Sequence, residues 1–395
     1  MIRGSTRPFE ESGKGPPKGN DPMKVMTILG TRPEIIRLSL IIGRLDSLCQ
    51  HVLVHTGQNY DPRLSDVFFE EMGIRRPDHY LGAGGETLGE QVGEILLECE
   101  KVLGQERPDR LLVLGDTNSA LSAFIAKRMG VPVYHMEAGN RCYDDRVPEE
   151  VNRRVIDHSS DVLMPYTERS RQNLLAEGIL GERIYVVGNP ISEVIRHFAA
   201  QIDSAPGPSR LGIPAAGYFL ATIHRAENVD NEERLRAIVQ AMRDVHRDTG
   251  LAGIVSLHPH TRRRLGEMGI LLEGDGLAAH APFGFFDFVA LERGARFLLT
   301  DSGTVQEEAA ILGIPSVTLR DTTERPETVE CGSNILSGVE PESVVRCVRV
   351  ALANQGKWKA PQEYLTENVS DTVLGVVLSY SGSEHGGQAG RRGGA

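Results

Sequence analysis

The stretch LLTDSGTVQEEAAILGIPSVTLRDTTERPETVECG, from Leu298 to Gly332, decides the fold of this chain. It predicts a strand over 296–300, a tight turn over 301–303, a helix over 304–312 and a second strand over 316–319. A Ser-Gly turn that opens a helix after a buried strand is typical of an anion site. The first backbone N–H groups and the positive end of the helix dipole both face the ligand there.

The side chains around this turn favour a nucleotide diphosphate as the anion. Ser302 and Gly303 form the turn, and Glu308 lies one turn into the helix, where a carboxylate can accept the hydroxyls of a ribose. The segment RDTTERPE, at 320–327, supplies guanidinium groups, which make bidentate contacts with phosphate. For the turn alone, a capping serine in a surface loop is an equally good interpretation. The neighbouring QEE and RDTTERPE segments favour the diphosphate site.

Composition describes a globular protein of two domains. The chain has 395 residues, of which 40% are hydrophobic and 25% are charged. The net charge of −11 argues against a nucleic acid or a membrane surface as partner. No apolar run approaches the roughly 20 residues that span a bilayer. The five cysteines are scattered without a CxxC pair, so we expect free thiols, a cytoplasmic location and no metal site.

Both ends of the chain are polar and rich in glycine, and we expect residues 1–22 and 381–395 to be disordered. The first of these segments lacks an apolar core, so we expect neither a secretory signal nor an anchor there. The remainder divides at a Pro- and Gly-rich linker, residues 204–217. We therefore predict a first domain over 23–203 and a second over 218–380.

Each domain shows short apolar strands that alternate with amphipathic helices. This pattern predicts an α/β fold with two doubly wound parallel sheets, each covered by helices on both faces. The ligand of such folds lies beyond the carboxyl ends of the strands, here in a cleft between the domains. The expected strands cover residues 24–29, 51–56, 110–115, 131–136, 162–166, 184–188, 218–223, 253–258, 296–300 and 315–319.

Polar side chains follow many of these strands, and each has an alternative, purely structural interpretation. Asp116 is placed to cap the next helix, and His224 is equally at home as a partly buried histidine. Glu149, at a helix start, suits the helix dipole. His258-Pro-His260 resembles a metal pair without a third ligand. The other candidates at strand ends or the next helix start are Arg32, Glu137, Arg141, Arg153 and Ser302.

Convergence favours a catalytic interpretation of the acidic positions. Asp116, Glu137 and Glu149 come from separate elements but should reach one crevice, opposite the diphosphate site. Several carboxylates beside a bound anion shift one another's protonation, as acid–base chemistry requires. No GxGxxG follows a strand, and neither a Walker A sequence nor a nucleophile elbow is present. We therefore expect proton transfer on a nucleotide-linked substrate.

Seven motifs, in order from residue 30 to residue 327, resemble those of the non-hydrolysing UDP-N-acetylglucosamine 2-epimerases: GTRPE, GDTNS, HMEAG, PEEVNR, HRAEN, DSGTVQEEA and RDTTERPE. The resemblance implies two Rossmann-like domains arranged as in GT-B glycosyltransferases, commonly as a homodimer, with neither a metal nor a nicotinamide cofactor. It also implies an anti elimination of UDP to a 2-acetamidoglucal, followed by re-addition of UDP and protonation of C2 on the opposite face.

The resemblance assigns roles residue by residue. It matches the family's catalytic carboxylates to Asp116, Glu137 and Glu149, and its UDP contacts to Arg32, His224, Ser302, Glu308 and Arg325. We expect catalysis from Asp116, Glu137, Glu149 and His224. We expect binding of the UDP-sugar by Arg32, Arg37, Arg141, Arg153, His258, Ser302, Gly303, Glu308 and Arg325.

Three segments depart from the family pattern. Arg37 stands where the family usually has Lys. HTGQNYD, at 55–61, replaces the QHR-type sequence that helps bacterial members bind UDP-GlcNAc as an activator. EAGNRCYDDRVPEE, at 137–150, looks closer to members that act on 6-deoxy sugars, and we expect this loop to face the sugar. The main hypothesis is conversion of UDP-GlcNAc to UDP-ManNAc. The alternatives are a 6-deoxy or diacetamido UDP-sugar, a hydrolysing epimerase, or a GT-B glycosyltransferase.

Overall fold

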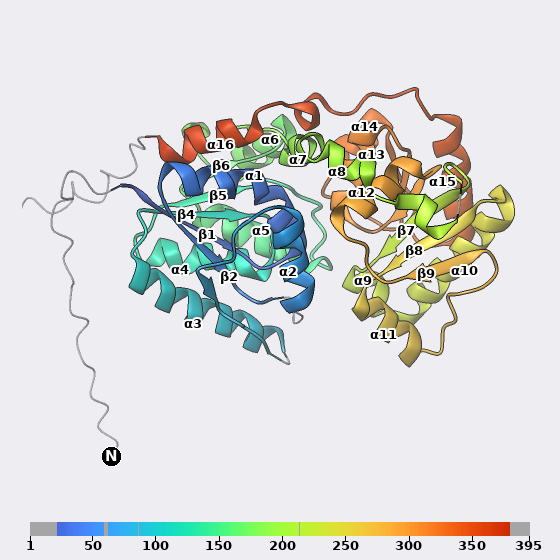
Figure 1. Ribbon diagram of the computed structural model, residues 1–395, viewed down its shortest axis with the longest axis horizontal. Coiled ribbons are helices and arrows are strands. Elements are labelled where there is room, and N and C mark those ends of the chain that lie inside the picture. The colour runs from blue at the N-terminus through green and yellow to red at the C-terminus, as the bar shows by residue number, and fades with distance from the viewer. Residues whose placement is uncertain (1–21, 59–61, 86, 213, 380–395) are drawn as a thin grey trace, which may run out of the picture.

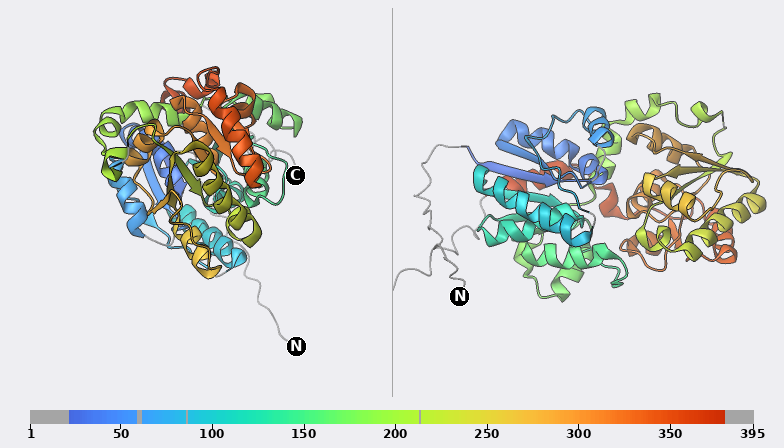
Figure 2. Two further views of the ribbon diagram at one scale, coloured as in Figure 1. Left: turned by 90° about the vertical axis from the view of Figure 1, so that its right-hand side faces the viewer. Right: turned by 90° about the horizontal axis from the view of Figure 1, so that it is seen from below.

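The computed structural model describes residues 22–58, 62–85, 87–212 and 214–379, with side chains from residue 67 onward in the second range. The segments predicted to be disordered, 1–22 and 381–395, lie outside these ranges except for Pro22. Two parallel sheets with their helices form two bodies side by side (Figure 1, Figure 2). The predicted α/β fold with two doubly wound sheets is confirmed.

The first sheet has the order β3-β2-β1-β4-β5-β6, and all of its strand pairs are parallel. Its strands are β1 (Lys24–Leu29), β2 (Gln50–His55), β3 (His79–Tyr80), β4 (Arg110–Leu114), β5 (Val133–Met136) and β6 (Val162–Met164). Its helices are α1 (Arg32–Leu48), α2 (Pro62–Glu71), α3 (Leu88–Glu106), α4 (Ser122–Arg128), α5 (Pro148–Ser159), α6 (Glu168–Ala176) and α7 (Pro190–His197).

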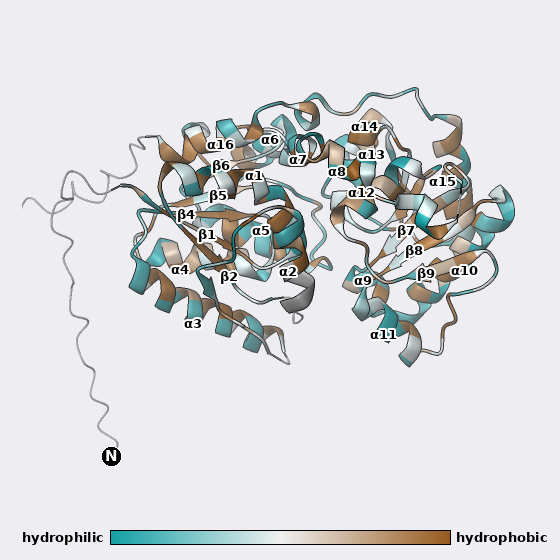
Figure 3. Cartoon of the chain, viewed as in Figure 1, coloured by the Kyte–Doolittle hydropathy of each residue, from teal (hydrophilic) through white to brown (hydrophobic). Residues whose placement is uncertain are grey.

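Both faces of this sheet are buried, as its uninterrupted apolar strands predict. In β1, Val25 and Leu29 belong to one core cluster, and Met26 and Ile28 belong to another on the opposite face. Figure 3 shows the result as hydrophobic strands between helices whose outer faces are hydrophilic.

The second sheet repeats the topology, with the order β12-β11-β10-β7-β8-β9. Its strands are β7 (Tyr218–Ile223), β8 (Ala252–Leu257), β9 (Leu277–His280), β10 (Leu298–Thr300), β11 (Ser316–Thr318) and β12 (Asn334–Leu336). Its helices are α9 (Ala226–Val229), α10 (Glu232–Thr249), α11 (Pro259–Glu267), α12 (Phe285–Gly294), α13 (Gly303–Leu312), α14 (Pro326–Cys331) and α15 (Pro341–Ala353). In both sheets the strand order reverses beside the first strand, where α/β folds place their ligands.

The chain crosses between the domains twice. Within the first crossing, α8 (Ala199–Ser204) and the following single turn at Gly207–Leu211 pack on α12. After the second crossing, α16 (Val369–Leu378) packs on α1 and α7 of the first domain (Figure 1). The domain boundaries predicted from the sequence placed 218–380 in the second domain, but α16 packs on the first. The spacing of apolar residues predicts a helix and its buried face, but it does not identify which sheet the helix covers.

Two further differences concern strands. The strand expected over 184–188 is wrong, since only an isolated bridge joins Leu163 and Ile184 there. The edge strands β3, β9 and β12 were not predicted from the sequence, because they are short and only partly buried. Among the described residues, no helix is both long and apolar enough to cross a membrane.

Candidate active site

A cavity of about 570 Å³ lies between the carboxyl ends of the two sheets. Its wall comes from the segments after β1, β4 and β5 in the first domain and after β7, β8 and β10 in the second. It includes most of the residues predicted to act on the substrate: Arg32, Arg37, Asp116, Glu137, Glu149, His224, His258, Ser302, Gly303, Glu308 and Arg325. Arg141 and Arg153 do not line it.

The turn before α13 brings the backbone close to an acidic side chain. Ser302 has extended backbone angles (φ −82°, ψ 131°) at the amino end of this ten-residue helix, and its hydroxyl hydrogen-bonds that of Thr304 at 2.9 Å. A Cβ at Gly303 would lie 2.5 Å from a carboxylate oxygen of Glu324, so this position requires glycine. The free N–H groups of the first helical turn therefore face the cavity at its floor.

Asp301 joins this turn to the segment after β7. Its buried carboxylate accepts hydrogen bonds from the backbone N–H groups of His224 and Arg225, both at 3.0 Å, and from the Asn228 amide at 3.2 Å. These bonds fix the HRAEN segment beside the DSG turn. The two motifs therefore form one rigid surface although 76 residues separate Arg225 from Asp301.

One arginine and two histidines, Arg32, His224 and His258, also line the cavity. The Arg32 guanidinium lies 5.6 Å from the centre of the Phe68 ring and has no ion-pair partner among the described residues. Burial, Arg32 and His224 lower the pKa of His258 to about 4. Burial beside the cavity also lowers the pKa of His224, against the opposing charge of Asp301. Both imidazoles are therefore neutral at neutral pH, and Arg32 is a free cation for an anionic ligand.

Glu308, on α13, lies next to a second buried carboxyl group, that of Glu292. Burial raises the pKa of Glu308 to about 7, and the nearby Arg37 guanidinium offsets only part of this effect. Its neighbour Glu292 is fully buried, and its pKa is raised well above the ordinary value. The charge of Glu308 adds to burial in raising the pKa of Glu292, so Glu292 retains its proton when Glu308 ionises.

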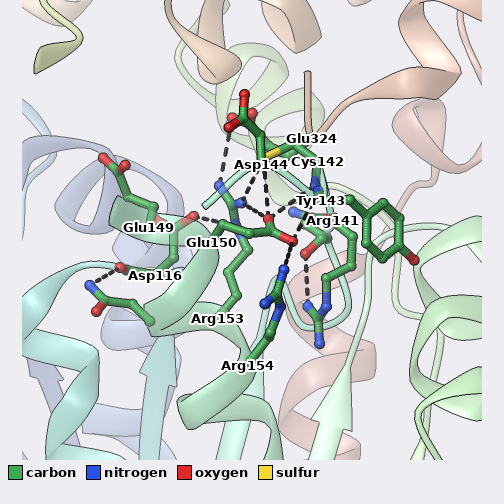
Figure 4. A network of polar contacts seen from close by, with 12 residues as sticks. Asp116, Arg141, Cys142, Tyr143, Asp144, Glu149, Glu150, Arg153, Arg154 and Glu324 are labelled. Atoms are coloured by element: carbon green, nitrogen blue, oxygen red, sulfur yellow. Dashed lines mark hydrogen bonds and ion pairs between the residues drawn. The ribbon is translucent and has the colours of Figure 1, made fainter. Parts of the chain in front are cut away.

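Asp116 follows β4 and is held by Arg153 from α5. The Arg153 Nε atom lies 2.7 Å from an Asp116 oxygen, and its Nη1 atom lies 2.6 Å from Glu150 (Figure 4). Burial raises the pKa of Asp116, and the negative charges of Glu137 and Glu149 add to this effect against the favourable Arg153 contact. Arg153 therefore positions a candidate catalytic residue and does not line the cavity, which differs from its predicted role in binding.

Glu137 occupies a strained position directly after β5. Its φ of 64° lies in the left-handed region, which is uncommon for a residue with a side chain and is enriched at functional sites. Both carboxylate oxygens are bound, one by Arg37 and the other by Arg325, each at 2.5 Å. Burial raises the pKa of Glu137, but these two guanidinium groups more than offset it, and the net shift is downward.

Glu149 begins α5 and is bound from the second domain. The Arg225 guanidinium lies 2.7 Å from its carboxylate and 3.3 Å from that of Glu324. Here too burial raises the pKa and the arginine more than offsets it, so the net shift is downward. The three candidate carboxylates therefore separate into one with a raised pKa, Asp116, and two with lowered values, an arrangement that sets acid and base roles apart.

Arg37 and Arg325 also bind Glu307, so their guanidinium groups are occupied by carboxylates. Both line the cavity, as expected for UDP contacts, yet neither offers a free charge to a diphosphate.

The middle of the loop between β5 and α5, residues 138–147, does not line the cavity. Glu150 accepts the backbone N–H groups of Cys142 and Tyr143 at 3.0 and 3.1 Å, which turns the loop outward (Figure 4). Arg146 then reaches Asp321 of the second domain at 3.3 Å. No described residue from 138 to 147 lines the cavity, whereas Glu137, Pro148 and Glu149 of the same segment do. The expectation that the segment 137–150 faces the sugar therefore stays a prediction for its two ends.

Arg141 is likewise structural. Its guanidinium lies 2.8 Å from Asp157 and 2.6 Å from Glu177, and its side chain is fully buried. The predicted role in substrate binding does not fit this position. Asp157 also accepts the Gly139 N–H at 3.2 Å and contacts His135 at 2.9 Å, so this cluster fixes the backbone that carries Glu137.

Sequence reasoning missed the partners of the catalytic candidates. Glu307 precedes Glu308 within QEE, and Glu324 lies within RDTTERPE, so both stand inside quoted motifs. The order of charged residues along the chain does not indicate that Glu307 and Glu324 pair with arginines of the other domain. No group of three or more His, Cys, Asp or Glu side chains suited to a metal ion exists in the described part of the chain.

Residues 44–378 match the family profile described as UDP-N-acetylglucosamine 2-epimerase. The UDP-N-acetylglucosamine 2-epimerase of Methanocaldococcus jannaschii is 43% identical over 348 residues, which cover 86% of this chain and 95% of the relative. The UDP-2,3-diacetamido-2,3-dideoxy-D-glucuronate 2-epimerase of Pseudomonas aeruginosa is 38% identical, with 84% and 92% covered.

Solved structures agree with these relationships. The crystal structure of the M. jannaschii enzyme in complex with UDP-GlcNAc and UDP has a TM-score of 0.86 at 41% identity, with 91% of this chain and all of that chain covered. Another structure of that enzyme has a TM-score of 0.69 at 40% identity, with 90% and 99% covered. The glycosyltransferase WaaG, at 12% identity and a TM-score of 0.57 over 90% of this chain and all of WaaG, shares the GT-B-like fold alone. On its motifs, fold and relatives, the chain belongs to the UDP-N-acetylglucosamine 2-epimerase family.

Proposed function

We propose that this chain is a non-hydrolysing 2-epimerase that interconverts UDP-GlcNAc and UDP-ManNAc. One observation carries the proposal: three carboxylates from separate elements of the first domain share a cavity with the DSG turn, Arg32 and Glu308. The turn and Arg32 suit a diphosphate, and Glu308 suits a ribose. The carboxylates then lie on the side of the cavity where the sugar must extend.

The reaction needs two acid–base groups because C2 changes configuration. A carboxylate removes the C2 proton, the C2–H electron pair forms the C1=C2 bond, and the C1–O bond breaks with its electrons leaving on UDP. UDP then attacks C1 of the 2-acetamidoglucal, and a carboxylic acid delivers a proton to the opposite face of C2. One carboxylate cannot reach both faces without the ring turning over.

The environments of the three carboxylates support a division of roles. Asp116, whose pKa is raised by burial, takes up a proton more readily than the other two and is assigned the role of the acid. Glu137 and Glu149, whose pKa values are lowered by Arg325, Arg37 and Arg225, are carboxylates. His224, neutral and close to the DSG turn, donates a hydrogen bond to the departing diphosphate without adding a full charge.

The test is incubation with UDP-GlcNAc in deuterated water, followed by proton NMR. We expect UDP-ManNAc to form with one deuteron at C2, and the remaining UDP-GlcNAc to acquire the same label. We expect no need for a metal or a nicotinamide, because each half-reaction combines proton transfer at C2 with cleavage or formation of the C1–O bond and involves no external oxidant or reductant. Absence of deuterium at C2 contradicts the mechanism. Stoichiometric release of free UDP and free amino sugar identifies a hydrolysing enzyme instead.

A second candidate substrate is a diacetamido UDP-sugar, which the Pseudomonas aeruginosa relative supports. The same carboxylates would serve C2, since epimerisation at that carbon is common to both reactions. The discriminating measurement is the ratio of kcat/KM for UDP-GlcNAc to that for UDP-2,3-diacetamido-2,3-dideoxy-D-glucuronate. A ratio above one supports the first candidate, and a ratio below one supports the second.

We further propose that the two domains close on the substrate about their two crossings. The cavity lined by residues of both domains supports this. Closure holds the glycal, which must not leave before UDP returns.

The homodimer and the cytoplasmic location stay predictions. Apolar side chains on the outer face of the neighbouring helices α3, α4 and α5 are exposed, among them Leu97, Phe124, Val151 and Val155. A second copy of the chain would cover them, and light scattering of the wild type and of Phe124→Glu tests this assignment. Five free thiols suit a reducing compartment.

A further inference from the structure

Four buried side chains form a closed ring of alternating charge between the domains. Arg37 and Glu137 come from the first domain, and Glu307 and Arg325 come from the second. Each guanidinium contacts both carboxylates, and each carboxylate uses both of its oxygens. Their exposed fractions are 3%, 6%, 0% and 4%, in the order given, so the ring is shielded from water.

Two of the four contacts cross the domain boundary. These are Arg37 with Glu307, and Glu137 with Arg325. If the second domain moves away, Glu137 keeps Arg37 but loses Arg325, and Arg37 loses Glu307. A buried charge that loses one partner is strongly destabilised. With the domains apart, the four charges would divide into two separate ion pairs, Arg37 with Glu137 and Arg325 with Glu307. The ring in which two guanidinium groups hold Glu137 is therefore complete only when the domains lie together.

Glu307 is the member of the ring without direct access to the substrate. It is fully buried and does not line the cavity, whereas Arg37, Glu137 and Arg325 do. Apart from its negative charge, which helps to raise the pKa of the adjacent Glu308, Glu307 reaches the reaction through the two arginines. They in turn hold both oxygens of Glu137, whose backbone is strained into the left-handed region.

We propose that Glu307 is a positioning residue that aligns Glu137 only when the domains close. It fixes Arg37 and Arg325 at the spacing that grips the two oxygens of Glu137. This inference rests on the proposed function, because the alignment of Glu137 matters for the C2 proton. It adds a residue outside the cavity, and it couples domain closure to the acid–base group.

The test is Glu307→Gln, which keeps the shape but leaves the ring with one unbalanced positive charge. We expect kcat for C2 deuterium exchange to fall about 10² to 10³-fold, because a misaligned Glu137 loses much of the roughly 10² to 10⁴-fold that a general acid–base group contributes. The affinity for UDP should stay within about threefold, since Glu307 touches no part of the cavity. Glu330→Gln is the matched control, because Glu330 pairs with Arg169 across the same boundary but in solvent. It should keep wild-type turnover.

A charge-balanced double variant separates positioning from simple structural damage. Arg37→Gln with Glu307→Gln leaves Glu137 and Arg325 as a neutral pair, so it should be at least as active as Glu307→Gln alone. Independent effects would multiply instead. Arg37→Lys keeps the charge and should retain most of the activity that Arg37→Gln loses. If Glu307→Gln does not fold, Glu307→Asp keeps the charge with a shorter reach and should lower kcat while UDP still binds.

Three results would overturn the inference: wild-type kcat in Glu307→Gln, multiplied losses in the double variant, or loss of UDP affinity in proportion to kcat. The wild-type deuterium experiment keeps the two hypotheses apart. If the wild type takes up no deuterium at C2, the proposed function fails. If it does and Glu307→Gln matches it, only the role of Glu307 fails.

Discussion

The affinity of this protein for uridine should rise between about pH 6 and about pH 8, because Glu308 ionises in that range. Burial raises the pKa of Glu308 to about 7, from an ordinary value of 4.5. Only the carboxylate accepts both ribose hydroxyls, so binding improves as pH rises through the pKa. A group with an ordinary pKa would be ionised throughout, and the affinity would stay flat.

The size of the effect follows from the ionised fraction. With a pKa of about 7, roughly one tenth of Glu308 is ionised at about pH 6 and roughly nine tenths at about pH 8. The affinity should therefore rise about tenfold, which corresponds to about 1.4 kcal/mol. At neutral pH, binding should release about half a proton, because half of the free protein is still protonated at its pKa.

Uridine is the suitable probe because, unlike UDP, it carries no phosphate that titrates in this range. Isothermal titration calorimetry gives the affinity at each pH, and buffers of different ionisation enthalpy give the protons released. The nearby His258 has a pKa of about 4 and stays neutral throughout. Glu34 also has a raised pKa of about 7, so Glu34→Gln is the control and should keep the step. Glu308→Gln should abolish it. A flat wild-type profile, or an unchanged step in Glu308→Gln, refutes the assignment of Glu308 to the ribose.

Other predictions concern catalysis, closure, cofactors and regulation. Turnover should fall about 10² to 10⁴-fold in Asp116→Asn, Glu137→Gln and Glu149→Gln, with UDP affinity retained because none of the three is among the groups assigned to UDP; near-normal turnover in all three would remove them from the mechanism. In the reaction of a variant that lacks only the re-protonating acid, free UDP and 2-acetamidoglucal should slowly accumulate. Small-angle scattering should show compaction with UDP, and identical curves would argue against closure about the linker at 204–217. Activity should survive EDTA and dialysis, whereas strict dependence on a metal or NAD would contradict the proposed chemistry. Because residues 55–61 read HTGQNYD, the reaction from pure UDP-ManNAc should begin without a lag; a lag abolished by traces of UDP-GlcNAc would show that an activator site is present.

The turns at the strand ends could be predicted because their chemistry is local. Thr31 and Glu34 form a capping box at the start of α1, with Pro33 in the first turn. Ser302 and Gly303 open α13 after β10, as the quoted stretch predicts. In each case a few adjacent residues determine the backbone. Parallel sheets then bring these turns to one edge, so the location of the cavity followed from the same information.

The position of α16 could not be predicted in this way. Val373 and Val377 give the helix an apolar face, but apolar faces of either domain would satisfy the same pattern. The buried Arg110 guanidinium donates a hydrogen bond to the carbonyl of Val377, near the helix end. This contact joins residues 267 positions apart. Pairing over such a distance leaves no periodic signal in one sequence.

The same limit applies to the carboxylates and their arginines. The acidic residues were found because each follows a strand or begins a helix. Their partners follow no such rule: Arg37 lies within α1, and Glu307 lies within α13. The sequence therefore indicated which groups carry chemistry. It contained no indication of which guanidinium tunes each one, because that depends on contacts formed only when the domains meet.

These contacts also change which charges remain for the substrate. Arg153 pairs with Asp116, and Arg225 pairs with Glu149. Arg37 and Arg325 each pair with both Glu137 and Glu307. Arginines at and beside the cavity are thus paired with carboxylates. The proposed mechanism therefore assigns a diphosphate to the amino end of α13 and to Arg32, which has no ion-pair partner among the described residues. Under this assignment UDP and the three carboxylates use different arginines, so the departing diphosphate does not compete for a guanidinium that already holds a catalytic carboxylate.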